Sequence, residues 1–69
     1  MKVKNEHLVG QRVRLVSCSD PYTKLQRGDE GTVDFVDDWG TVFVKWDSGS
    51  SLGLIEEAGD CFEVIGQSR

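Results

Sequence analysis

The chain is 69 residues long, the size of one small domain, and its 12 acidic and 8 basic side chains give a formal net charge of −4 at pH 7. No apolar run approaches the length of a membrane span, and the first residues lack the apolar segment of a signal peptide. These properties exclude a multidomain protein and a helical membrane protein. We expect one cytoplasmic domain over residues 1–69, with a folded body over 10–65 and flexible ends at 1–9 and 66–69.

Glycine punctuates the chain at regular distances, and the stretches between the glycines are rich in valine, threonine and aromatic residues, which favour strands. Helical periodicity is not sustained anywhere. We predict five strands, at about residues 11–18, 31–36, 41–46, 51–55 and 61–65.

The first predicted strand, 11–18, alternates polar and apolar residues and is followed by a long connection. Asp20-Pro21 in this connection is typical of a turn. Tyr22 and Leu25 are unusual in a purely solvated loop. We therefore expect the connection to pack on the body of the domain or to serve a function.

The most strongly patterned part of the chain is the hairpin of residues 31–46. Its loop reads Asp37-Asp38-Trp39-Gly40, and the glycine can take the positive φ that such loops require. Pairing across this loop puts the large apolar residues on one face, whereas a slip of one residue would separate them. The predicted pairs are Val36 with Thr41, Phe35 with Val42, Val33 with Val44, and Gly31 with Trp46. The core predicted with this register consists of Val33, Phe35, Val42, Val44, Trp46, Leu52 and Leu54.

The next turn, residues 47–50, contains a glycine between serines. A three-residue loop with a glycine bulge keeps the apolar residues of both strands on one face, whereas a two-residue loop would mix the faces. We predict the bulged loop, which pairs Trp46 with Leu52 and Val44 with Leu54.

Five short strands with one long first connection and then tight hairpins are typical of an SH3-like five-stranded small barrel, so the predicted fold class is all-β. In that architecture the first and last strands are antiparallel neighbours, which brings Cys18 near Cys61. We expect both to be reduced thiols, because nothing else indicates an oxidising compartment, and a disulfide between them stays open as an alternative.

The strings DPYTKL, GDEGTV, VKWDSGSSLGLI and FEVI lie within residues 10–65. In this pattern the chain resembles a family of small bacterial and phage domains with no assigned function. The resemblance implies a stand-alone domain, often encoded on phages or other mobile elements, and it brings no catalytic residues. A weaker likeness to KOW domains, at Gly10–Val13 and Gly28–Val33, supports the barrel fold. It does not support RNA binding, because acidic residues offset the charge of the basic residues between these segments.

Three aromatic residues lie outside the sheet face that we expect to form the core: Tyr22, Trp39 and Phe43. SH3-like domains bind peptides through aromatic residues between the first loop and a later hairpin. With Asp37 and Asp38 beside them, these residues are the candidate site for a protein partner. An exposed Trp39 also favours weak self-association. The alternative is that Tyr22 and Phe43 only cover the second face of a small barrel.

Two further functions stay open. Arg12, Arg14, Lys24 and Arg27 would form a basic face for nucleic acid or the ribosome, as in KOW-like domains, although the net negative charge disfavours this. The acidic residues of the central hairpin would instead form a face that mimics DNA, as in an inhibitor of phage type.

Catalysis and metal binding have no support in the sequence. The serines lack a companion base, His7 is the only histidine, and the acidic residues lack the spacing of a calcium loop. We predict no enzymatic activity, no cofactor and no metal. The predicted function is that of a non-enzymatic module that binds a protein partner.

Overall fold

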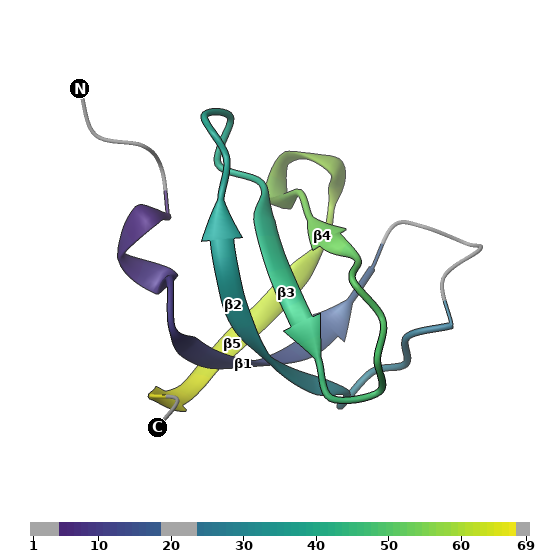
Figure 1. Ribbon diagram of the computed structural model, residues 1–69. Coiled ribbons are helices and arrows are strands. Elements are labelled where there is room, and N and C mark those ends of the chain that lie inside the picture. Colours follow the sequence, from purple (N-terminus) through teal and green to yellow (C-terminus); the bar gives the residue numbers. More distant parts are fainter. Residues whose placement is uncertain (1–4, 19–23, 68–69) are drawn as a thin grey trace.

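Figure 1 shows the computed structural model of the domain, in which residues 5–18 and 24–67 are described. The fold is all-β, with five strands in one antiparallel sheet and two short turns of 3-10 helix. In chain order the elements are η1 (Glu6–Leu8), β1 (Gln11–Ser17), β2 (Glu30–Val36), β3 (Val42–Trp46), β4 (Gly53–Leu54), η2 (Glu56–Ala58) and β5 (Cys61–Gln67). The five strands confirm the predicted ones, with ends that differ by one or two residues.

The strands follow the order β4-β3-β2-β1-β5 across the sheet, so the first and last strands are antiparallel neighbours, as predicted. β1 and β5 run obliquely behind β2 and β3, in the manner of a small SH3-like barrel (Figure 1). Ser17 pairs with Cys61 at one end of this ladder. Cys18 and Cys61 nevertheless form no disulfide in the structure, so the disulfide alternative does not apply.

The register of the β2–β3 hairpin agrees with the prediction over its first half and departs from it near the tip. Gly31 pairs with Trp46 and Val33 with Val44, as predicted. A bulge between Val33 and Phe35 then places Phe35 opposite Phe43. One extra residue turns the following side chain to the other face of the sheet. The prediction of Phe35 as a core residue is therefore wrong: its side chain is 50% exposed.

The pairing of β3 with β4 is shifted by two residues relative to the prediction. Leu54 pairs with Val42 instead of Val44, and the backbone N–H of Trp46 donates to the carbonyl of Ser50 (3.2 Å) instead of pairing near Leu52. A shift of two residues keeps the same side chains on the same face, because successive side chains of a strand alternate. Leu54 therefore still reaches the core, where it is fully buried.

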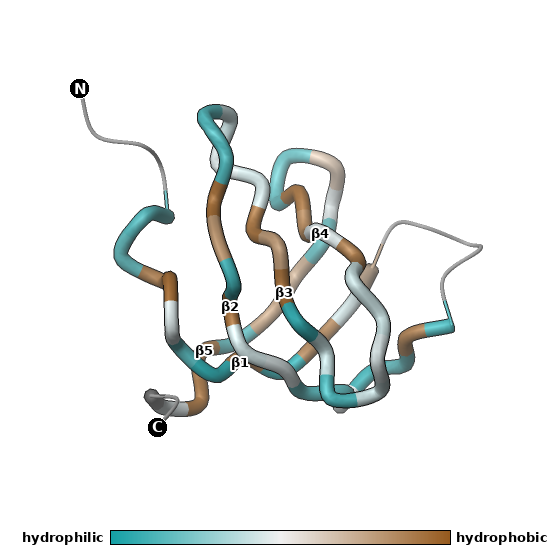
Figure 2. The backbone as a smooth tube through the Cα atoms, in the orientation of Figure 1, coloured by the Kyte–Doolittle hydropathy of each residue, from teal (hydrophilic) through white to brown (hydrophobic). Residues whose placement is uncertain are grey.

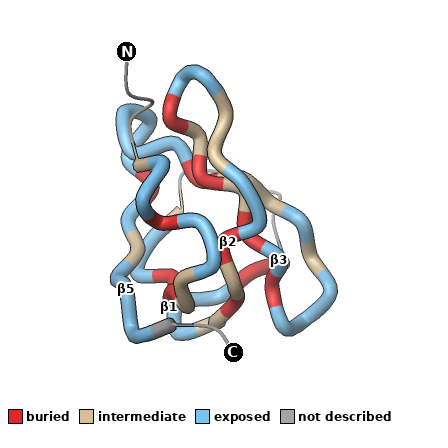
Figure 3. The backbone as a smooth tube through the Cα atoms, turned by 60° about the vertical axis from the view of Figure 1, so that its left-hand side comes forward, coloured by how far each residue is buried: buried red, intermediate tan, exposed pale blue. Residues whose placement is uncertain are grey.

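The core lies between the curved halves of the sheet. Figures 2 and 3 show the hydropathy and the burial along the chain. Buried positions alternate with more exposed ones in β3 and over residues 12–15 of β1. Trp46 is 2% exposed, and its indole Nε1–H donates to the carbonyl of Leu52 (3.0 Å). The buried apolar residues are Leu8, Val13, Leu15, Leu25, Val33, Val42, Val44, Trp46 and Leu54, against which Cys18, Val36, Leu52 and Phe62 pack.

Two core residues come from outside the strands. Leu25 confirms that the long first connection packs on the body, whereas Tyr22 lies outside the described residues. Leu8 belongs to η1, in the segment that we expected to be a flexible end. None of the helical turns in the described ranges has the length or apolarity to cross a membrane.

Candidate functional site

The tip of the β2–β3 hairpin is closed by its own backbone and by one aspartate. Oδ1 of Asp37 accepts hydrogen bonds from the backbone N–H groups of Trp39 (3.0 Å) and Thr41 (2.9 Å). The N–H of Gly40 donates to the carbonyl of Asp37 (3.0 Å). The φ of Gly40 is positive, as predicted, at 84°. Aspartate commonly organises turns in this way. The tip is thus held without the indole of Trp39, which is 83% exposed.

A second loop, residues 55–60, is closed by the buried carboxylate of Asp60. Its Oδ2 accepts a hydrogen bond from the backbone N–H of Ile55 (2.8 Å), and its own N–H donates to the carbonyl of Ile55 (3.2 Å). These bonds hold the loop while the side chains of Ile55, Glu56 and Glu57 remain exposed. Asp60 is not among the residues predicted from the sequence, because nothing in the local pattern distinguishes a buried aspartate from a solvated one.

Asn5 joins the two loops. Its Nδ2 donates to the carbonyl of Gly40 (3.3 Å) and to Oε1 of Glu56 (2.7 Å). Asn5 has a φ of 67°, in the left-handed region that asparagine tolerates better than most residues. The side chain therefore links the hairpin tip to η2. It lies 35 positions from Gly40 and 51 positions from Glu56 in the sequence, so no local pattern predicts the link.

The two loops enclose a groove of roughly 370 Å³, which we call the Trp39 groove. Its walls combine an exposed indole, an exposed branched aliphatic side chain and two carboxylates. The lining residues are Trp39, Gly40, Thr41, Ile55, Glu56 and Glu57. The groove has no paired nucleophile and base, and nowhere in the described chain do three or more metal-ligating side chains gather.

The other predicted site residues are not all brought to this groove. Phe43 lies in a second groove of roughly 290 Å³, where its ring stacks on Phe35 with centroids 4.5 Å apart. Asp38 is exposed beside Trp39, and Asp37 holds the tip. Of the three aromatic candidates, the structure thus places Trp39 and Phe43 in separate grooves, and Tyr22 lies outside the described residues.

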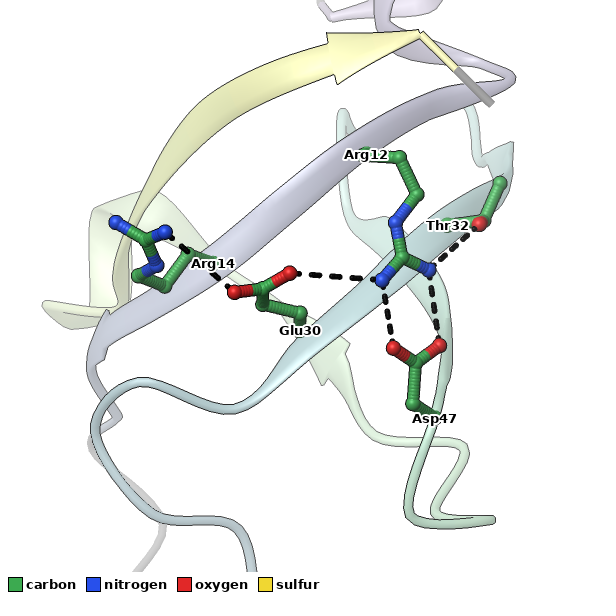
Figure 4. Close-up of polar contacts among 5 residues, drawn as sticks. All are labelled: Arg12, Arg14, Glu30, Thr32 and Asp47. Atoms are coloured by element: carbon green, nitrogen blue, oxygen red, sulfur yellow. Dashed lines mark hydrogen bonds and ion pairs between the residues drawn. The ribbon is translucent and has the colours of Figure 1, made fainter. Parts of the chain in front are cut away.

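The basic candidates on β1 are engaged in ion pairs (Figure 4). The guanidinium of Arg12 donates to both carboxylate oxygens of Asp47 (2.8 and 2.6 Å) and lies 3.6 Å from Glu30. Arg14 donates to Glu63 (2.8 Å) and lies 3.4 Å from the other oxygen of Glu30. Acidic side chains on β2, β5 and the β3–β4 turn thus offset both charges.

The remaining basic candidates, Lys24 and Arg27, are exposed and have no partner among residues 5–18 and 24–67. Of the four basic candidates, two are therefore held in ion pairs and two are exposed.

Comparison with known proteins identifies the family. DUF4314, described as a domain of unknown function, matches residues 1–65, which is nearly the whole chain. The chain belongs to this family. This confirms the resemblance to an uncharacterised family of small domains. No curated protein and no solved structure matches the chain.

In this DUF4314 domain the Arg12–Asp47 pair makes stability depend on pH. The hydrogen bonds from Arg12, together with its charge, lower the pKa of Asp47 below the usual value of 3.8, and partial desolvation opposes this effect. The same pair raises the pKa of Arg12, which stays charged throughout. A carboxylate with a lowered pKa in the folded state stabilises it above the pKa of the unfolded state, and the effect is lost as the pH falls through the folded-state value.

Asp47→Asn is therefore expected to lower the urea midpoint slightly at neutral pH, with a difference from the wild type that shrinks in acid and in high salt. The measurement is urea denaturation at neutral pH and at a pH below the usual aspartate pKa. Asp34→Asn is the matched control, because Asp34 is exposed and has no partner in the described part of the chain. An equal effect of both substitutions at neutral pH would contradict the prediction.

Proposed function

We propose that this domain is a non-enzymatic binding module of bacterial or mobile-element origin, working in the cytoplasm, that engages a protein partner through the Trp39 groove. The observation that carries the proposal is the 83% exposed indole on a tip held by bonds that do not involve it. A large aromatic side chain exposed to water gains free energy when a partner covers it.

Rigidity of the platform supports the same function. Both walls of the Trp39 groove are held by hydrogen bonds of buried or half-buried groups: Asp37 at the tip, Asp60 in the second loop, and Asn5 between them. A preorganised surface loses little conformational entropy on binding. Aromatic residues on such surfaces are typical binding hot spots.

The two alternative functions have weaker support. Arg12 and Arg14 already face carboxylates, so binding to phosphate would first have to break these ion pairs. A DNA mimic presents acidic residues along a face, whereas the acids of this domain that lie nearest the Trp39 groove flank an exposed apolar surface.

The domain is accordingly expected not to bind duplex DNA or RNA at physiological ionic strength. The measurement is fluorescence anisotropy of a labelled duplex titrated with the protein at low and physiological salt. Micromolar binding that weakens steeply with added salt would favour the nucleic-acid alternative over the protein partner.

Trp39→Ser tests the site. We expect the free energy of unfolding to change by no more than about 0.5 kcal/mol, as is usual for an exposed position, and partner binding to be lost. Tagged wild-type and variant domains are incubated with nuclease-treated bacterial lysate, and retained proteins are quantified by mass spectrometry. Sedimentation of each purified domain shows whether a second copy is the partner.

Phe35→Ser is the matched control, since Phe35 is also an exposed aromatic residue but lines the other groove. Proteins retained by the wild type and by Phe35→Ser but lost with Trp39→Ser support the proposal. A large loss of thermal stability in a monomeric Trp39→Ser variant would make Trp39 a structural residue, and equal retention by all three domains would remove the groove as the site.

A further inference from the structure

The two loops that form the Trp39 groove, residues 37–41 and 55–60, are acidic, and neither loop contains a basic side chain. Residues 37–41 and 55–60 contain five acidic residues and no lysine or arginine. Between residues 28 and 68 the sequence has one basic residue, Lys45, and it lines the second groove instead. The field at the Trp39 groove therefore favours a cationic ligand.

The two carboxylates of the groove have no ion-pair partner among residues 5–18 and 24–67. Glu56 accepts a hydrogen bond from the neutral amide of Asn5 (2.7 Å), which orients the carboxylate without neutralising it. Glu57 is exposed and makes no ion pair or hydrogen bond within the described residues. By contrast, three acidic residues near β1, namely Glu30, Asp47 and Glu63, face Arg12 or Arg14.

The apolar walls suit a long cationic side chain. Trp39 presents its indole, and Ile55, 46% exposed, lines the same groove. Indole is the strongest cation–π acceptor among the side chains, and the aliphatic stem of a basic residue packs on apolar surface while its head stays beside acids. A guanidinium also stacks on aromatic faces and forms paired hydrogen bonds with carboxylates, which an ammonium does not.

We propose that the Trp39 groove binds an arginine side chain from a basic segment of the partner, with the guanidinium against the indole and the carboxylates of Glu56 and Glu57. This inference rests on the proposed function and names the chemistry that the groove recognises. It also fits the sequences of loops 37–41 and 55–60, which contain no lysine or arginine that would compete for the same carboxylates.

The test uses the full chain and the blocked tripeptide acetyl-Gly-Arg-Gly-amide, with matched peptides in which citrulline or lysine replaces arginine. Binding is followed by NMR through the indole Nε1–H of Trp39 and the backbone amides of Glu56 and Glu57. We expect a saturable shift of these signals with the arginine peptide, and binding weaker by about tenfold or more with the neutral citrulline peptide. Lysine is expected to bind between the two.

A charge-removing variant tests the carboxylates without disturbing the groove. In Glu56→Gln/Glu57→Gln the new amide oxygen at position 56 still accepts the bond from Asn5, so the link between the loops is kept. We expect about tenfold weaker binding of the arginine peptide and a smaller salt dependence. Phe35→Ser, in the second groove, is expected to bind the peptide as the wild type does.

Equal binding of the citrulline peptide, or unchanged binding by the glutamine variant, would overturn the inference. Lysine binding as tightly as arginine would overturn the assignment of a guanidinium. If the arginine peptide causes no saturable shift at Trp39 while Trp39→Ser still loses its protein partner, this inference fails and the proposed function stands. If Trp39→Ser retains every protein that the wild type retains, the proposed function fails as well.

Discussion

Trp46→Ala is expected to leave most of the domain unfolded at room temperature. Trp46 is 2% exposed at the centre of the core, and removing a buried aromatic side chain costs about 3–5 kcal/mol. A domain of this length has a total stability of roughly 3–10 kcal/mol. The truncation also removes the hydrogen bond from the indole to the carbonyl of Leu52. The loss is measured by circular dichroism and urea denaturation.

Trp39→Ala is the matched control for this prediction, because the same chemical change is made at an 83% exposed position. Its free energy of unfolding is expected to stay within about 0.5 kcal/mol of the wild type. Trp46→Phe should fall between the two, since it keeps part of the ring volume and loses the hydrogen bond. A cooperatively folded Trp46→Ala domain of wild-type stability would contradict the position of Trp46 in the core.

Gly31→Ala is expected to destabilise the domain by about 2–3 kcal/mol or more, although it adds only one methyl group. A Cβ atom at Gly31 would lie 2.6 Å from Cγ1 of Val44, 2.7 Å from the carbonyl oxygen of Lys45 and 2.8 Å from Cα of Trp46. Two of these atoms belong to the backbone of the paired strand, so they cannot move aside without breaking the β2–β3 ladder. Thermal and urea denaturation measure the effect.

Gly28→Ala is the control for Gly31→Ala, because it introduces backbone strain without a steric clash. Gly28 has a φ of 96°, but a Cβ atom there would meet nothing within 4 Å. We expect a cost of about 1–2 kcal/mol from the backbone conformation alone. A Gly31→Ala variant that is no less stable than Gly28→Ala would show that the close approach of Gly31 to Trp46 is relieved easily.

The candidate site was predictable only in part. In the sequence, Trp39 lies between acidic residues and a glycine at a predicted hairpin tip. Because a tip projects from the sheet, this position was sufficient to predict that the indole is exposed. The groove beside it was not predictable, since its second wall comes from Ile55, Glu56 and Glu57 in a different loop. Asn5 brings this loop to the tip through contacts between residues far apart in the sequence.

The ion pairs of the first strand were likewise not predictable from the sequence. Arg12 and Arg14 stand out in the sequence as free cations on one face of a strand. The acids that offset them come from three other parts of the chain: Glu30, Asp47 and Glu63. Which acid faces which base depends on the register of β1 with its neighbours, and composition contains no information on that register.

The sequence by itself determined the all-β class and the positions of the five strands. It also determined, through the alternation of side chains along a strand, the burial of Val33, Val42, Val44 and Trp46. These features are local, because strand alternation and turn residues act over a few positions. Only the tertiary structure decided the bulge that turns Phe35 outward and the pairing of Leu54 with Val42. A shift of one or two residues in pairing changes little locally, so packing of the whole core selects among the registers.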